Sequence, residues 1–371
     1  MAQAKGGAEE DALLAALYEE QGESEKLALD DSIAKKYQQG IPAAAKVALV
    51  VLLALAILVS ISIGTYSMNP LDVIEAVWAH FATPDDLPDA NMDIIVFNIR
   101  IPRVLTVVLV GAALAAAGVA FQALFRNPLT SPDLLGASAG ASLGACIAIL
   151  LGFSSLAIQG SAFVGGILAV CATLWVSSLV RSEPTLSLVL GGMLVSQLFQ
   201  AGVSVVKYVA DSADKLPEIT FWLMGSFADV SGSDLAVCCV PILVGLAILL
   251  SQSWKLNLMS FGEEEAASLG VNVKATRIIV IAAATLITSA SVAVSGVVGW
   301  VGLVVPHAAR ALVGSNNRTL LPVSMVLGAL FLLVVDDLAR TIATVEVPIS
   351  ILTAIVGVPF FIVVFRHNMK A

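Results

Sequence analysis

A serine between two glycines is the first pattern in this sequence that could carry chemistry. Gly136-Ala137-Ser138-Ala139-Gly140 fits the G-x-S-x-G pattern of hydrolases, in which the serine attacks a carbonyl carbon. That chemistry requires a strand-to-helix turn, with a histidine and an acid behind the serine. Here the motif lies in an apolar stretch that predicts a helix, and the chain has only three histidines, His80, His307 and His367. No catalytic residue is therefore predicted.

The sequence does not support a metal site or a nucleotide site either. The four cysteines lie in apolar runs and form no C-x-x-C pair, so they predict neither a zinc site nor a disulfide framework: Cys146, Cys171, Cys238 and Cys239. A lone His307 beside Arg310 on one helix face is more typical of a packed residue than of a ligand. The G-x-x-x-x-G-K-[ST] phosphate loop is absent from the sequence. We expect this chain to bind no metal and no other cofactor.

Three arginines stand out because they lie close to apolar segments. Arg100 and Arg103 precede one such segment, and Arg340 lies near the end of another, after Asp336 and Asp337. One interpretation is interfacial anchoring, with Arg340 paired to Asp336 within the same helix. The other is an exposed positive surface that docks an acidic partner. The residues alone leave both open.

The polar stretch 253–277 contains a short predicted helix. Gly262 starts it and Gly270 stops it, and acidic residues in the first turn complement the helix dipole. Its small and apolar residues give it more apolar surface than a solvated linker helix needs. Insertion into a groove on a cytoplasmic partner is the second interpretation. The residues concerned are Gly262, Glu263, Glu264, Ala266, Ala267, Leu269 and Gly270.

The composition shows what must position these residues. Of 371 residues, 58% are hydrophobic and 13% are charged, whereas soluble domains carry about 25% charged residues. The net charge is −9, and no basic stripe indicates a nucleic-acid partner. Apolar runs long enough to cross roughly 30 Å of hydrocarbon recur along the chain. The sequence predicts an all-α polytopic membrane protein.

We count ten apolar segments, each continuous rather than alternating and therefore helical: 43–64, 104–125, 135–152, 156–180, 187–209, 235–252, 276–297, 299–313, 320–342 and 348–366. The segment 65–99 has six acids and no Lys or Arg, so it is predicted outside, with both termini cytoplasmic. Residues 1–41 read as an acidic, disordered cytoplasmic extension, and 42–371 as the membrane domain, in which 253–277 is a cytoplasmic loop.

Two of the shorter segments are entered through Gly- and Pro-rich sequence, near Asn127-Pro128 and near Gly299. Paired interruptions in two halves of a chain indicate an inverted repeat around a central pathway, here with spans 2–5 corresponding to spans 7–10. Ordinary close packing explains the single glycines equally well. The candidate structural or pathway residues are Asn127, Pro128, Gly136, Gly140, Gly302 and Pro306.

Taken in order, these motifs resemble the permease subunits of FecCD/BtuC-type binding-protein-dependent ABC importers, which take up ferric siderophores, haem, cobalamin and related metal chelates. The resemblance covers about residues 95–366. Its strongest segments are Arg100-Ile-Pro-Arg103, Gln122–Leu129, Pro132–Gly136, Phe261–Gly270, Gly302–His307 and Asp336–Arg340.

The resemblance implies a ten-helix subunit of the type II importer fold in a bacterial inner membrane, paired with a second copy or a close relative. It implies that Arg100, Arg103 and Arg340 dock a substrate-binding protein and that 262–270 couples to one of two cytoplasmic ATPase subunits, which use ATP and magnesium. Span 5, the segment 216–227 and span 10 would line and gate the pathway.

Two positions depart from the family pattern, and one other class of transporter stays open. Ser350 stands where the family usually has glycine, and Trp300 where phenylalanine is more usual. The extension 1–41 has no family counterpart.

The alternative function is that of a secondary transporter of a small solute. No span centre, however, carries the Asp, Glu and His chain of a proton-coupled pathway.

Overall fold

The computed structural model describes residues 42–64, 68–82, 90–180 and 183–368. Within these ranges every regular element is a helix, as the continuous apolar runs predict. The acidic extension 1–41 lies outside the described residues, as does Lys370, so the prediction of disorder there stays a prediction.

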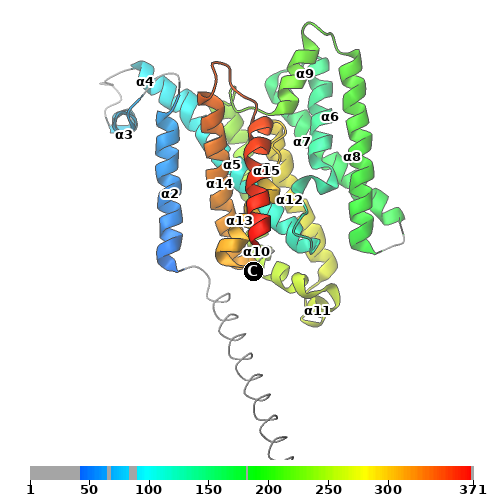
Figure 1. Cartoon of the computed structure of the whole chain (residues 1–371). Helices are drawn as coiled ribbons and strands as arrows, with labels where there is room; N and C mark the ends of the chain where they lie inside the picture. Colours follow the sequence, from blue (N-terminus) through cyan, green and yellow to red (C-terminus); the bar gives the residue numbers. More distant parts are fainter. Residues whose placement is uncertain (1–41, 65–67, 83–89, 181–182, 369–371) are drawn as a thin grey trace, which may run out of the picture.

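The helices follow one another with short connections, and Figure 1 labels them. They are α2 (Ala43–Ser62), α3 (Pro70–Ala82), α4 (Ala90–Ile94), the π-helix η1 (Ile95–Arg100), α5 (Ile101–Leu124), the 3-10 turn η2 (Pro132–Leu135), α6 (Ala137–Leu150), α7 (Ser155–Leu179), α8 (Pro184–Val209), α9 (Lys215–Met224), α10 (Gly232–Phe261), α11 (Glu263–Ser268), α12 (Val273–Ser295), α13 (Val301–Val313), α14 (Asn317–Thr341) and α15 (Ile349–Asn368).

Each predicted span coincides with one of these helices. In the described part of the chain, seven are long and apolar enough to cross a membrane, and they correspond to α2, α5 with its preceding turns, α7, α8, α10, α12 and α14. The other three predicted spans coincide with the shorter apolar helices α6, α13 and α15. The all-helical membrane architecture is confirmed, whereas the number of ten crossings and the inverted repeat stay predictions.

The boundary that differs most is that of the polar stretch 253–277. The α10 helix continues to Phe261 and α12 begins at Val273, so most of the predicted loop is helical. The prediction ended the span at 252 because polar residues begin there. Polar residues continue a helix readily once it leaves the membrane, since the backbone hydrogen bonds do not depend on the side chain.

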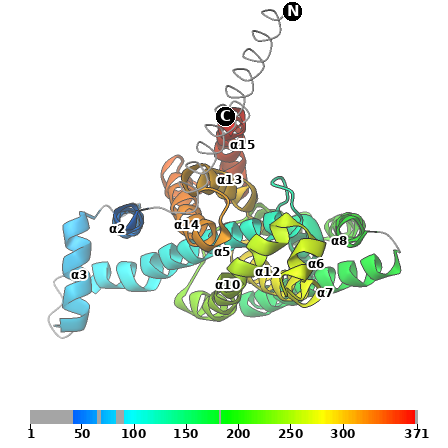
Figure 2. The same cartoon turned by 90° about the horizontal axis from the view of Figure 1, so that it is seen from below.

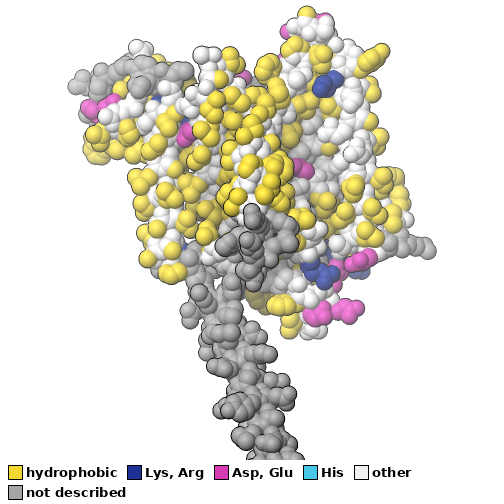
Figure 3. All heavy atoms as spheres, in the orientation of Figure 1, with side chains coloured by type: hydrophobic (Ala, Val, Ile, Leu, Met, Phe, Trp, Pro, Cys, Tyr) yellow, Lys and Arg dark blue, Asp and Glu magenta, His cyan; other side chains and the backbone are white. Residues whose placement is uncertain are grey.

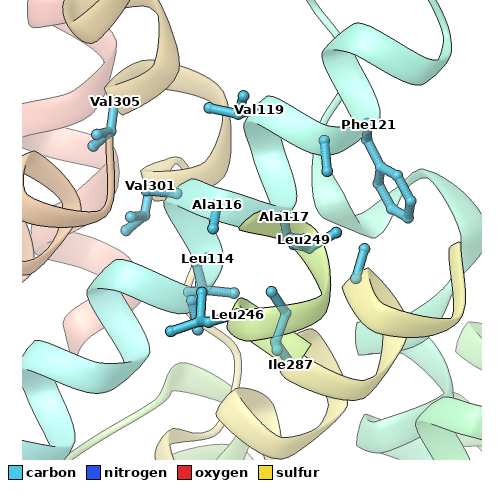
Figure 4. Close-up of a cluster of buried hydrophobic side chains, with 14 of the residues drawn as sticks. Leu114, Ala116, Ala117, Val119, Phe121, Leu246, Leu249, Ile287, Val301 and Val305 are labelled. Atoms are coloured by element: carbon cyan, nitrogen blue, oxygen red, sulfur yellow. The ribbon is translucent and has the colours of Figure 1, made fainter. Parts of the chain in front are cut away.

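The centre of the molecule is α5, which α10, α12, α13 and α14 surround (Figures 1 and 2). Figure 4 shows Leu114 and Ala117 of α5 close to Leu246 and Leu249 of α10 and Ile287 of α12. These side chains are all buried. The core is apolar and rich in alanine, which allows the helix backbones to approach closely.

Glycine marks the closest approaches. A Cβ added to Gly118 of α5 would lie 1.9 Å from the carbonyl oxygen of Gly302 on α13, and one added to Gly111 would lie 2.3 Å from that of Gly328 on α14. Gly140 of α6 meets Gly165 of α7 in the same way, at 2.3 Å. No larger residue fits these crossings without separating the helices.

The surface matches a chain that lies in lipid. On the face seen in Figure 3, hydrophobic side chains cover most of the length of the helices, and most charged side chains gather near α11 and near the opposite end. The two ends are called here the α11 end and the α9 end, after the helices that lie there in Figure 1.

Candidate functional site

The predicted arginines meet at the α9 end in one charged network. Arg103, in the first turn of α5, donates from Nε and Nη2 to Asp336 of α14, with Nη2 2.8 Å from Oδ1. The same guanidinium donates from Nη1 and Nη2 to Glu346, at 2.7 and 2.9 Å. Glu346 lies in the connection between α14 and α15. Arg103 therefore joins three parts of the chain through two carboxylates.

Arg340 and Arg100 tie α2 to the same network. Arg340 pairs with Asp336 at 3.2 Å and also with Asp337, and it donates to the hydroxyl of Ser60 at 2.9 Å. Arg100 donates to the backbone oxygen of Ser62 at 2.9 Å. Since Ser60 and Ser62 belong to the last turn of α2, these contacts fix the end of that helix against α14 and η1.

Burial distinguishes the members of the network. The side chain of Asp336 is fully buried, and those of Arg103 and Arg340 are 7% exposed, whereas that of Glu346 is 38% exposed. Arg100 is also buried. The exposed positive surface considered from the sequence is therefore wrong for this conformation, because each arginine points inward to carboxylates or backbone oxygens. The docking role of Arg100, Arg103 and Arg340 stays a prediction.

At the α11 end the structure contains the predicted short helix. The α11 helix runs between Gly262, with φ +136°, and Gly270, with φ +85°. Glycine adopts these left-handed values without the steric cost of a Cβ. The Glu263 carboxylate pairs with Arg277 of α12, which holds α11 against the end of that helix.

The apolar surface of this segment differs in part from the prediction. Ala266 and Val271 are buried in the main hydrophobic core, and they therefore anchor α11 on the rest of the protein. Ala267 and Leu269 are exposed, and so is Phe261 at the end of α10, with exposed fractions of 59% for Leu269 and 71% for Phe261. The exposed apolar surface at this end therefore centres on Phe261 and Leu269. Glu264 is exposed beside it.

The candidate structural or pathway residues divide into two groups. Gly136, Gly140, Gly302 and Pro306 are buried at helix contacts, which is the packing role that the sequence allowed. Asn127 and Pro128 are exposed in the turn after α5, where the Asn127 Oδ1 accepts from the backbone N–H of Leu129.

The hydrolase pattern has no catalytic surroundings in the described residues. Ser138 lies in the first turn of α6, and its hydroxyl donates to Asp133. The Nδ1 of His307 lies 2.9 Å from the carbonyl oxygen of Leu303, one turn earlier in α13, and the His307 ring packs against Phe361. Ser138 thus contacts a carboxylate but no described histidine, and the motif needs a histidine between the serine and the acid.

The sequence interpretation missed the partners of Arg103. The sequence predicted Asp336 as an ion-pair partner of Arg340 alone, and it gave no reason to place Glu346 in the site. The one available signal was the position of Glu346 two residues before Pro348, at the start of the last apolar segment. Gln122 is a further missed contact, since its side-chain oxygen accepts from Arg310 at 2.9 Å.

Comparison with known proteins gives this arrangement a context. Residues 52–367 match the FecCD transport family. The molybdate import system permease MolB of Haemophilus influenzae is 42% identical over 313 residues, 84% of this chain and 92% of that protein. The hemin permease HmuU of Yersinia pestis is 38% identical over 315 residues, 83% of this chain and 92% of that protein.

The fold comparison agrees. A solved structure, described as an inward-facing conformation of a metal-chelate type ABC transporter, has a TM-score of 0.79 and 39% sequence identity. It covers 88% of this chain and all of that one. The family match over residues 52–367 includes both the charged network and α11. The chain therefore belongs to the FecCD transport family and is a permease of the ABC-importer type.

Proposed function

We propose that this permease carries a metal complex across the bacterial inner membrane, driven by ATP hydrolysis on separate subunits. The observation that carries the proposal is the family match over residues 52–367, which includes both ends where partners would bind. Related permeases are named for molybdate, iron chelatin, cobalamin and hemin. The shared substrate class is a metal held in a chelate or an oxyanion. The chain itself is proposed to bind no cofactor.

The α11 end suits an ATPase partner. Phe261, the last residue of α10, and Leu269, which follows α11, form an exposed apolar surface beside α11. The α11 helix lies between Gly262 and Gly270 and is held by the Glu263–Arg277 pair. A rigid apolar projection of this kind fits a groove on a second protein. We propose two ATPase subunits, one for each permease copy, which use ATP and magnesium. Under this proposal the α11 end is the cytoplasmic end.

The α9 end suits the substrate-binding protein. Of the two carboxylates that contact Arg103, that of Glu346 is the more exposed. An acidic residue of the binding protein could reach the guanidinium by displacing Glu346, without exposing the fully buried Asp336. Docking would then exchange one carboxylate for another, so that Arg103 never loses its partner in a buried site.

A second permease copy would complete the pathway. The face of α8 is largely exposed, with Met193, Leu194 and Leu198 between 57% and 70% accessible. We propose that α8, α9 and α15 face the two-fold axis and that both termini are cytoplasmic. Membrane lipid covers the remaining apolar surface, and no nucleic acid is involved.

The secondary transporter is the other candidate, and it predicts no role for α11. The test is Leu269→Arg, with Val345→Arg as the matched control because Val345 is 74% exposed at the opposite end. The permease is co-expressed with its ATPase, and co-purification and ATP-dependent uptake are measured. We expect Leu269→Arg to lose ATPase association and uptake while Val345→Arg retains the association. Full association and uptake in Leu269→Arg would contradict the importer mechanism.

A further inference from the structure

The α3 helix carries an exposed apolar stripe that the transport function does not explain. Leu71, Ile74, Trp78 and Phe81 recur at helical spacing and are 70%, 51%, 73% and 77% exposed. Glu75 is also exposed on this helix. An exposed apolar stripe beside a charged residue is typical of a helix that has an apolar neighbour on one side and water on the other.

The position of α3 shows where that neighbour lies. In Figure 1 α3 is seen nearly end-on while α2 runs along its length, and in Figure 2 the two views are reversed. The helix therefore crosses the end of a membrane-spanning helix at a steep angle, in the manner of an interfacial helix. Val73 and Ala76 of α3 itself are buried.

A second set of contacts holds α3 in this orientation. The Nδ1 atom of His80 lies 2.7 Å from Oδ1 of Asp93, and its ring stacks on Phe97 with the ring centroids 3.8 Å apart. Asp93 and Phe97 belong to α4 and η1, which lead directly into α5. The position of α3 is thus set by the long central helix as well as by α2.

Between α2 and α3 lies an apolar groove of about 650 Å³. Its walls include Ala54 and Leu58 of α2 and Ile74, Trp78 and Phe81 of α3, and none of the described residues that line it is charged. Ala54 lies eight residues before the end of α2, about 12 Å deeper at 1.5 Å per residue. The groove therefore extends from α3 toward the hydrocarbon interior.

We propose that this groove binds the acyl chain of a membrane lipid and that α3 lies in the interface of the adjacent leaflet with Trp78 as its anchor. The membrane window of α2 is only 6% buried in the protein, so the groove continues a surface that already faces lipid. Tryptophan is enriched at this depth in membrane proteins. A second copy is disfavoured as the occupant, because α3 lies at the opposite side of the subunit from α8 in both views. The choice of lipid over a second copy rests on the proposed α8 interface, and the name of the leaflet, the outer one, rests on the proposed orientation.

The first test measures the surroundings of Trp78. Trp175, Trp222, Trp254 and Trp300 are replaced by Phe in the full-length protein, which is reconstituted in phosphatidylethanolamine and phosphatidylglycerol bilayers. We expect lipids brominated on the acyl chain to quench Trp78 at least about threefold more strongly than they quench the matched single-tryptophan protein that retains the partly buried Trp222. Quenching of Trp78 by aqueous iodide instead of bromolipid, or protection from both by a second copy, would overturn the proposal.

The second test fills the groove. Ala54→Phe places a ring in it, and Ala48→Phe is the matched control because Ala48 is exposed on the same helix and does not line the groove. Native mass spectrometry counts the lipids retained after detergent extraction. We expect Ala54→Phe to lose one lipid and to lower bromolipid quenching of Trp78, with no change in Ala48→Phe. Identical lipid retention and quenching in the two variants would overturn the groove assignment. Neither test uses the ATPase or the binding protein, so its failure leaves the transport proposal standing.

Discussion

Two helices of this protein have nearly the same hydropathy and opposite surroundings. The window in α2 has a mean hydropathy of 2.7 and is 6% buried, whereas the window in the long helix that ends with α5 has a mean hydropathy of 2.5 and is 83% buried. The two helices also differ in side-chain size. The middle of α5 reads Gly111-Ala-Ala-Leu-Ala-Ala-Ala-Gly118, whereas α2 is rich in Leu, Val and Ile. Small residues allow neighbouring helices to approach, and large ones fill space against lipid chains.

The largest expected effect concerns α5, the buried helix of this comparison. Gly118→Leu forces a side chain into a crossing where even a Cβ would lie 1.9 Å from the Gly302 oxygen. We expect no folded protein to be recovered, because the backbones of α5 and α13 cannot separate without opening the core. Gly160→Leu is the control, since a Cβ at that position meets nothing within 4 Å. Yield and monodispersity after detergent extraction measure the outcome, and equal recovery of the two variants would contradict the packing argument.

The next effect concerns the charges that fix the first turn of α5. Asp336→Asn removes the buried carboxylate shared by Arg103 and Arg340. Arg103 keeps Glu346 and Arg340 keeps Asp337. The network nevertheless loses its fully buried negative charge, and breaking a buried ion pair costs about 3–5 kcal/mol. Denaturant unfolding of the purified protein in detergent micelles measures the change in the free energy of unfolding. Glu346→Gln is the control, and we expect it to cost at most about 1 kcal/mol because Glu346 is more than one third exposed. Similar costs for the two would contradict the assigned burial.

A smaller effect tests whether the network at the head of α5 is also a docking site. If an acidic residue of the binding protein displaces Glu346 from Arg103, Glu346→Gln weakens the competitor. We expect the Kd of the binding protein for the reconstituted permease to fall about fivefold, which corresponds to about 1 kcal/mol. Glu218→Gln removes a similarly exposed charge at the same end, where Glu218 pairs with Lys215. Surface plasmon resonance compares the variants, and an equal gain in both would mean that general electrostatics, not exchange at Arg103, changes the affinity.

The smallest expected effect is that of a substitution in α2, the exposed helix. Leu55→Ala shortens a side chain that is 55% exposed, and we expect a change in the free energy of unfolding within about 0.5 kcal/mol. Leu114→Ala in α5 shortens a buried leucine and is expected to cost about 2–5 kcal/mol. The same unfolding measurement applies to both. A large loss for Leu55→Ala would show that another protein surface, not lipid, covers that side of α2.

Much of this protein could be predicted from its sequence because the signals are local. A continuous apolar run indicates a membrane helix wherever it occurs, since its backbone must be hydrogen-bonded internally in lipid. Gly262 and Gly270 likewise bound α11 through their own backbone angles. The order of the motifs carried the family resemblance, which the match over residues 52–367 confirms.

The tertiary structure decided which residues meet. Arg103 lies 233 residues from Asp336 and 243 from Glu346, and no periodicity or motif connects positions so far apart. The packing of α5 against α14 brings them together, and burial then requires that their charges be paired. The sequence by itself determined that α2 and α5 are apolar helices. Only the packing of the whole chain placed one in the core and the other at the margin, because burial depends on neighbours that hydropathy does not describe.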